Sequence, residues 1–183
     1  MMRAKKSLGQ HFLIDRRAIE RIVGAVPPGS TVLEIGPGRG ALTLPLCARA
    51  AKVVAVEKDD ALAAWWQAHA PKNLLLVHAD ALDLLPELLD AHAPDAIVGN
   101  LPYNISGPLT ALLVEHARAP MVLMYQQEVA ERICAKPGAR AYGRLTALVA
   151  YRWRAELWFR LPPEAFRPRP KVRSAVVRFR PAD

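Results

Sequence analysis

The sequence is poor in cysteine: Cys47 and Cys134 are the only two among 183 residues, and they lie far apart in the chain. Two distant cysteines make neither a disulfide framework nor a cysteine-based zinc site. The histidines are also scattered, without the HxxxH or HExxH spacing of a metal-binding helix. We therefore expect a cytoplasmic chain that holds no metal.

Long apolar runs are missing as well. No stretch of about 18 uncharged apolar residues is present, although a helix that spans a bilayer needs one. The basic first 17 residues lack the apolar stretch of a signal peptide. We expect a soluble chain that is not exported and has no membrane partner.

Acidic residues are scarce near the C-terminal end. The formal net charge is +8, and between Arg132 and Arg180 there are 13 basic and only 2 acidic side chains. Such an imbalance attracts a polyanion or an anionic membrane surface, although basic side chains can also simply form a solvated face. The skew favours contacts with the phosphates of a nucleic acid.

A length of 183 residues is typical of one globular domain, and so is a composition of 52% hydrophobic and 23% charged residues. Asp15 is expected to cap a helix that runs to Val26. Short apolar runs separated by helical stretches predict strands at 31–35, 52–57, 73–78, 95–100 and 121–126. Two alternating segments, 151–160 and 172–180, predict an antiparallel pair that closes the sheet. The pattern predicts an α/β fold, doubly wound and Rossmann-like, with a mostly parallel seven-stranded sheet and an antiparallel C-terminal strand.

A glycine-rich turn follows the first of these strands. Gly36, Gly38 and Ala41 satisfy the G-x-G-x-x-G/A pattern between a strand and a helix. Glycine at such a turn lets the backbone approach a bound nucleotide closely. The pattern alone leaves a dinucleotide site and a turn without any ligand as alternatives.

Carboxylates follow the next two predicted strands. Glu57 ends the second strand, 19 residues after Gly38, where it can accept hydrogen bonds from ribose hydroxyls. Asp80 follows the third strand and can accept from an adenine amine. Acidic residues also occur at such places merely as helix caps. Their position at the carboxyl edge of the sheet favours a nucleoside site.

The segment Asn100-Leu101-Pro102-Tyr103 ends the fourth strand. The Asn100 amide oxygen and the Leu101 carbonyl offer two acceptors for an amine, and Tyr103 offers a flat face for a base. The alternative is a proline turn with an Asx-type hydrogen bond. After three strand ends that suit a nucleoside, we favour a site for the exocyclic amine of a base.

Five segments of the sequence resemble the bacterial small-subunit rRNA adenine dimethyltransferases of the KsgA type. They are KKSLGQHFLID, LEIGPGRG, GNLPYNIS, QQEVAERICAKPGARAYGRLTALVAY and FRPRPKVRSAVVR. The resemblance extends from Lys5 to Arg180, and the last two segments are its most specific part. It implies a methyltransferase fold that uses S-adenosylmethionine, with two adjacent adenosines near the end of small-subunit rRNA as acceptors.

The resemblance also implies roles for individual residues. Those expected to bind the cofactor are Gln10, His11, Leu13, Glu34, Gly36, Gly38, Glu57, Asp80, Ala81 and Asn100. Those expected to hold the target base are Asn100, Leu101, Pro102 and Tyr103, with Phe166 stacking on the other face of the base. Residues Phe12 and Leu13 could instead be an apolar anchor for the N-terminal arm. The tryptophans, Trp158 among them, are expected to pack rather than to stack on bases.

By the same resemblance, residues 1–14 form a basic arm that closes over the cofactor, and residues 15–183 form the catalytic domain. The family carries a further helical C-terminal domain, which we expect to be absent because the chain stops at Asp183. The expected partners are small-subunit rRNA and the pre-30S ribosomal particle, bound by a monomer.

Three other functions remain open at this point. A related enzyme could modify large-subunit rRNA and confer macrolide resistance, although GNLPYNIS and AYGRL favour the small-subunit type. A nicotinamide-dependent oxidoreductase would share the glycine turn and Glu57, but it leaves the Asn100 segment without a use. An RNA-binding ribosome assembly factor with little catalysis is the third.

Overall fold

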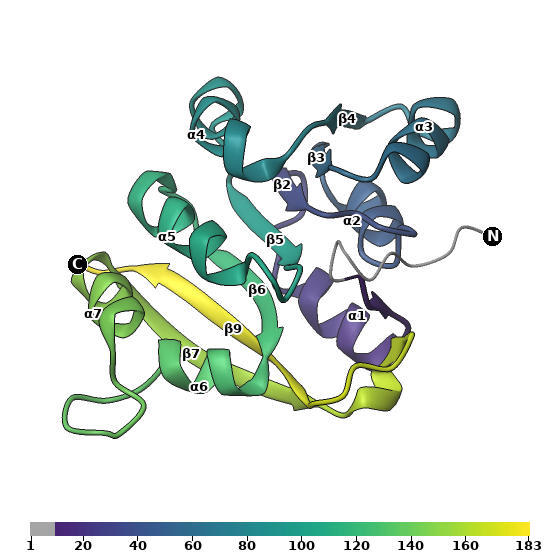
Figure 1. Ribbon diagram of the computed structural model, residues 1–183. Helices are drawn as coiled ribbons and strands as arrows, with labels where there is room; N and C mark the ends of the chain where they lie inside the picture. The colour runs from purple at the N-terminus through teal and green to yellow at the C-terminus, as the bar shows by residue number, and fades with distance from the viewer. Residues whose placement is uncertain (1–9) are drawn as a thin grey trace.

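The computed structural model describes residues 10–183, so residues 1–9 of the predicted basic arm lie outside the described part. Its centre is a seven-stranded sheet with the strand order β4-β3-β2-β5-β6-β9-β7 (Figure 1). The strands are β2 Thr31–Ile35, β3 Lys52–Glu57, β4 Leu74–His78, β5 Ala96–Asn100, β6 Met121–Gln126, β7 Trp153–Leu161 and β9 Ser174–Pro181. The first five run parallel, and β9 is antiparallel to both of its neighbours, β6 and β7. This architecture confirms the fold predicted from the sequence.

Helices cover both faces of the sheet. They are α1 Arg16–Gly24, α2 Thr43–Arg49, α3 Asp60–His69, α4 Ala81–His92, α5 Ser106–His116, α6 Gln127–Ile133 and α7 Arg144–Arg152. One apolar core joins the sheet to α4–α7, and a second joins the other face to α1–α3. The inner parallel strands β2, β3, β5 and β6 are mostly buried on both faces, as parallel strands in doubly wound folds are. No helix among residues 10–183 has the length and apolar character needed to cross a membrane.

The ends of several elements follow from local chemistry. The Asp15 side chain accepts a hydrogen bond from the Ala18 N–H at 3.0 Å and so caps α1 as predicted. One prediction was wrong: Tyr151 and Arg152 belong to α7 and not to a strand. The helix continues to that point because the Trp153 N–H still bonds the Val149 carbonyl, and only then does the chain become extended.

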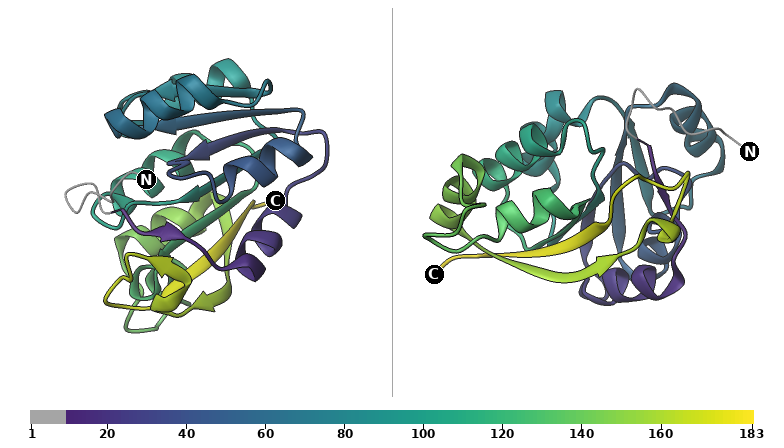
Figure 2. Two further views of the ribbon diagram at one scale, coloured as in Figure 1. Left: turned by 90° about the vertical axis from the view of Figure 1, so that its right-hand side faces the viewer. Right: turned by 60° about the horizontal axis from the view of Figure 1, so that its bottom comes forward.

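A short second sheet joins the two ends of the described chain. Strand β1, Phe12–Leu13, pairs antiparallel with β8, Phe166–Arg167, just after the 3₁₀ turn Pro163–Ala165. Figure 2 (left) shows the purple β1 segment beside the yellow-green segment that holds β8. The pairing holds residues 10–13 beside the carboxyl ends of the parallel strands, where a ligand site is expected.

Candidate active site

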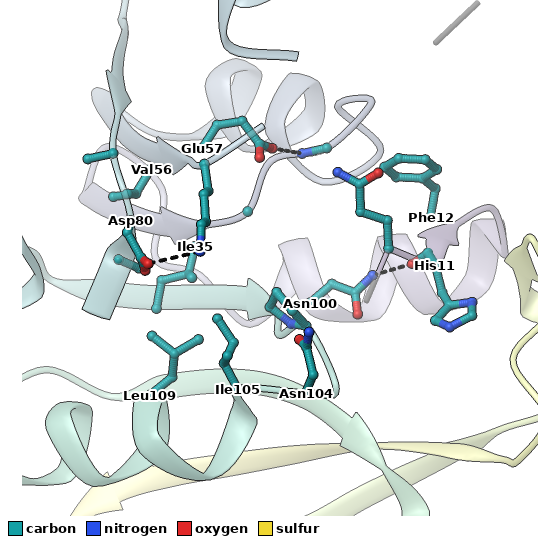
Figure 3. A pocket seen from close by; sticks show the side chains of 17 residues that line it. His11, Phe12, Ile35, Val56, Glu57, Asp80, Asn100, Asn104, Ile105 and Leu109 are labelled. Carbon is teal, nitrogen blue, oxygen red and sulfur yellow. Dashed lines mark hydrogen bonds and ion pairs between the residues drawn. The ribbon is translucent and has the colours of Figure 1, made fainter. Parts of the chain in front are cut away.

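A pocket opens at the carboxyl edge of the parallel strands (Figure 3). Of the residues predicted for a site, it is lined by Gln10, His11, Gly36, Gly38, Glu57, Asp80, Ala81, Asn100 and Pro102. These residues end or follow β2, β3, β4 and β5, or precede β1. Residues singled out at separate strand ends in the sequence therefore face one common space.

The glycine turn after β2 brings the backbone to the pocket wall. Gly36 and Gly38 have φ of +72° and +55°, values that L-residues with a side chain rarely adopt. A Cβ on Gly38 would lie 3.0 Å from the Phe12 ring. The Gly38 peptide is held from two sides, because its N–H donates to Glu57 and its carbonyl accepts from the Trp66 indole at 2.9 Å. The turn is thus held at two points and presents backbone without side chains to the pocket.

Glu57 holds its carboxylate at the end of β3. One oxygen accepts from the Gly38 N–H at 3.1 Å, and the other accepts from the Asp59 N–H at 3.0 Å. The Lys58 N–H also acts on this carboxylate. A carboxylate has about four acceptor positions, so acceptor capacity remains for a ligand hydroxyl such as that of a ribose. Burial raises the pKa of Glu57 above its ordinary 4.5, against the lowering effect of the backbone N–H groups of Asp59, Gly38 and Lys58.

Asp80 lines the pocket and also caps α4. One of its oxygens accepts from the Leu82 N–H at 3.0 Å, and the other lies 3.0 Å from the Lys58 ammonium. The capping interpretation considered for Asp80 is therefore correct, and it coexists with a place in the pocket wall. Lys58, which sequence reasoning did not select, adds a positive charge beside it.

Asn100 connects the pocket to the N-terminal segment. Its Nδ2 donates to the main-chain carbonyl of His11 at 2.8 Å. A carbonyl oxygen can only accept, so this bond sets which end of the amide is nitrogen. The Oδ1 atom of Asn100 is then the acceptor left for a ligand. Figure 3 shows Asn100 between His11 and the start of α5.

Tyr103 and Leu101 flank the pocket without lining it. Tyr103 is 41% exposed, and its ring centroid lies 5.9 Å from that of His11. The exposed ring is available to a base at the mouth of the pocket. The Leu101 side chain is buried, and its N–H donates to the Met124 carbonyl on β6. Any role for Leu101 therefore falls to its main chain, as predicted from the sequence.

Phe166 and Leu13 are not brought to the pocket. They lie opposite each other in the β1–β8 pair, with exposed fractions of 2% and 4%. Both belong to the apolar core on the α1–α3 side. A ring buried to this degree has no free face for a base, so the stacking role predicted for Phe166 is not supported by this structure. For Leu13, the apolar anchor considered as an alternative describes what is seen.

Glu34 is also outside the pocket, which corrects its predicted place beside the cofactor. Side chains alternate along β2, so Ile35 faces the pocket whereas Glu34 points to the opposite face. There Glu34 is 1% exposed and accepts a hydrogen bond from the Thr43 hydroxyl at 2.5 Å. Burial is the main cause that raises its pKa to about 8, with Glu57 adding to the effect.

We expect Glu34→Gln to flatten the pH dependence of stability. The folded chain keeps the Glu34 proton up to a pKa of about 8, whereas the unfolded chain loses it near 4.5. The folded state then binds more protons in this window, so the free energy of unfolding falls as pH rises through it. Gln still accepts from Thr43 but does not titrate. Urea unfolding at about pH 6 and about pH 7 measures the effect. Between these pH values the free energy of unfolding should fall by about 1 kcal/mol more in the unmodified chain than in the Glu34→Gln variant. Equal losses would mean that Glu34 titrates normally.

Sequence reasoning missed part of the pocket wall. The missed residues are Phe12, Ile35, Val56, Lys58, Ala79, Asn104, Ile105 and Leu109. Most are apolar, and their pattern gives no sign that they leave the core for a cavity. Ile105 and Leu109 could have been found, because an i, i+4 pair directly after the Asn100 segment places both on one side of the first helical turn.

Comparisons of the sequence with family models and with curated proteins point to the same family. The sequence model of the family described as ribosomal RNA adenine dimethylase matches residues 1–183. The chain is 46% identical over 186 residues to the ribosomal RNA small subunit methyltransferase A of Xanthomonas axonopodis pv. citri, covering 98% of this chain and 71% of that relative.

Two solved structures are similar over nearly the whole chain. A dimethyladenosine transferase from Plasmodium falciparum matches with a TM-score of 0.82 and 30% identity, covering 94% of this chain and 64% of its own. The 23S rRNA methyltransferase ErmE matches with a TM-score of 0.76 and 31% identity, covering 93% of this chain and 70% of its own.

Proposed function

The chain belongs to the ribosomal RNA adenine dimethylase family, and we propose that it methylates the exocyclic amines of two adjacent adenosines near the 3′ end of small-subunit (16S) rRNA. It is an S-adenosylmethionine-dependent methyltransferase in sequence and in fold. The 46% identity to a small-subunit enzyme over 98% of this chain favours the small-subunit substrate.

One observation carries the proposal. A single pocket is lined both by the glycine turn with Glu57 and by Asn100 with Pro102. The first group suits a nucleoside cofactor, and the second offers acceptors for an amine. Group transfer between two bound molecules requires such a shared space, because the reacting atoms must be held close together and in line. A nicotinamide oxidoreductase leaves the second group without a purpose.

The residues present fit S-adenosylmethionine. Glu57 retains acceptor capacity for a ribose hydroxyl beside its backbone donors, and Asp80 with Ala81 lines the part of the pocket where the adenine would lie. The glycine turn would face the methionine part, and Gln10 and His11 would close the pocket. When bound, this cofactor supplies a methyl group on a positively charged sulfur that leaves as a neutral thioether.

The chain's own part in the chemistry is to position the amine. The Asn100 amide oxygen and the Leu101 carbonyl would accept the two amine hydrogens and so turn the nitrogen lone pair out of conjugation with the ring. No strong general base is needed, because the amine proton becomes strongly acidic once the methyl is attached. Catalysis then rests on orientation and electrostatic fit. The adenine must leave its stack to reach Asn100, with Tyr103 as the exposed ring beside it.

The wider setting of the reaction is also part of the proposal. We take the pre-30S ribosomal particle as the partner, a monomer as the active form and the cytoplasm as the place where ribosomal RNA is modified. The arm at residues 1–14 would close over the cofactor, and residues 15–183 would carry the catalytic domain. The His11 to Asn100 hydrogen bond supports the arm's role, since it ties this segment to the pocket.

Cofactor titration and methyl transfer together test the proposed function. We expect calorimetry to show binding of S-adenosylmethionine and none of NAD, and we expect methyl incorporation into small-subunit rRNA. Large-subunit rRNA is the matched control. Incorporation into the large-subunit RNA alone would move the chain to the macrolide-resistance type. Cofactor binding with no transfer to small-subunit RNA, free or as pre-30S particles, would favour an assembly factor.

A further inference from the structure

Strands β7 and β9 carry an exposed group of arginines far from the pocket. Along β9, Ala175, Val177 and Phe179 face the core under α4–α7, so the alternate residues Arg178 and Arg180 face the other way. In β7, Arg154 and Glu156 lie on that same face, opposite Arg180 and Arg178 in the register. We call Arg154, Arg178, Arg180 and Arg21 of α1, with Trp158 beneath, the arginine face.

The arginine face lies where the sheet loses its cover. The apolar core on the α1–α3 side reaches Val176 and Leu161, with Trp158 and Phe159 partly buried at its edge. Beyond them, the β7 and β9 residues on this face, Arg154, Glu156, Arg178 and Arg180, are exposed. Figure 2 (right) shows the green helices α6 and α7 on one side of β7 and β9, and the purple helix α1 near the ends of these strands that lie away from the C-terminus. Among residues 10–183, no helix covers the half of this face nearest the C-terminus.

The Trp158 ring supports the guanidinium groups of Arg178 and Arg21. The Arg178 guanidinium lies 4.3 Å from the Trp158 ring centroid, and that of Arg21 lies 5.0 Å from it. Stacking of this kind restrains a guanidinium and leaves its N–H groups free at the edge. Trp158 is half-buried under these groups, in agreement with the packing role expected for it.

The charges are not balanced within the face. Arg178 pairs with Glu156 at 3.3 Å, but Arg154 stands directly opposite Arg180. Like charges at directly opposed positions of an antiparallel pair are destabilising. Arg154 donates hydrogen bonds at 3.3 Å to the carbonyls of Ala150, in the last turn of α7, and of Trp153 at the start of β7. Among the described residues no carboxylate forms an ion pair with Arg154 or Arg180, so a second positive charge stays directly opposite the first. An anion bound between the two would remove the repulsion.

We propose that the arginine face binds the phosphate backbone of the substrate RNA, as a second contact remote from the methylation site. The inference rests on the proposed function, which supplies RNA as the polyanion. Arg180 lies six residues along β9 from Ser174 at the pocket edge of the sheet, or about 20 Å at 3.4 Å per residue. Outward guanidinium groups on an open sheet face suit phosphate oxygens, so the face would contact RNA irrespective of sequence.

The opposed arginine pair provides the test. We expect Arg154→Gln with Arg180→Gln to make the salt dependence of binding to 16S rRNA less steep, by about 0.7–0.9 in log–log slope for each phosphate that is no longer neutralised. The melting temperature should stay level or rise, because a repulsion is removed. Cofactor affinity and the methylation rate at saturating RNA should not change.

Lys52→Gln with Lys72→Gln is the matched control, since it removes the same charge near the opposite edge of the sheet. Glu156→Gln is expected to strengthen RNA binding by freeing Arg178. Equal slopes for the arginine pair and the lysine pair would overturn the proposal, as would binding to vesicles of phosphatidylcholine and phosphatidylserine with no effect on RNA. A chain that never methylates RNA would instead refute the proposed function.

Discussion

Asn100→Ala is expected to lower kcat for methyl transfer by about 10²- to 10³-fold, the usual loss when one preorganised hydrogen-bonding group is removed from a transition state. The structure adds a reason for the size of the effect. The Asn100 amide is oriented by its bond to the His11 carbonyl, so its oxygen needs no reorientation to meet the amine. The measurement is single-turnover methyl incorporation at saturating cofactor and RNA.

Cofactor affinity should fall much less than turnover in this variant, because Glu57 and the glycine turn remain intact and only the bond from Asn100 to the His11 carbonyl is lost. Asn73→Ala is the matched control. Asn73 donates to the Cys47 and Ala50 carbonyls outside the pocket, so its loss should lower the melting temperature but leave kcat unchanged. If Asn100→Ala weakened cofactor binding as much as turnover, the assignment of Asn100 to the target amine would be wrong.

Glu57→Ala should weaken S-adenosylmethionine binding by about 1.5–3 kcal/mol, the range for charge-assisted hydrogen bonds, which is roughly 10- to 150-fold in Kd. Two losses combine here. The ribose hydroxyls lose their acceptor, and the Gly38 and Asp59 N–H groups lose theirs, so the glycine turn is no longer held. Isothermal titration calorimetry measures the effect directly.

Glu87→Ala, which removes an exposed carboxylate from α4, is the control and should bind the cofactor normally. The unmodified chain should also lose cofactor affinity when the pH is lowered, and this loss should begin at a higher pH than it would with a carboxyl group of ordinary pKa. Burial raises the pKa of Glu57, so protonation removes its charge earlier as pH falls. Unchanged affinity in Glu57→Ala would exclude the carboxylate from the cofactor site.

The sheet and most of the pocket could be predicted because they follow from local patterns. Apolar runs set the strands, and parallel strands bring their carboxyl ends together, so Glu57, Asp80 and Asn100 had to be neighbours. Phe166 was misplaced for a different reason. Its burial depends on the pairing of β8 with β1, and no local pattern predicts contact between segments so far apart in the chain.

Glu34 shows a similar limit. The motif places it one residue from Ile35, which does line the pocket, yet strand alternation turns the two side chains to opposite faces. The arginine face was visible in the sequence only as an excess of charge. Its particular members could be selected only once the register put Arg154 opposite Arg180 and the core showed which face was bare.

The position of β9 has a consequence for how the chain is made. β7 comes earlier in the sequence than β9, but it joins the sheet solely through β9. In the same way, β1 can pair only after β8 has been synthesised. During synthesis from the N-terminus, the parallel strands up to Gln126 can assemble first, while β6 remains an open edge. Only when residues 166–181 have left the ribosome can both pairings form. The cover of the pocket is therefore completed last, and the pairing of distant segments is the slow part of such a fold.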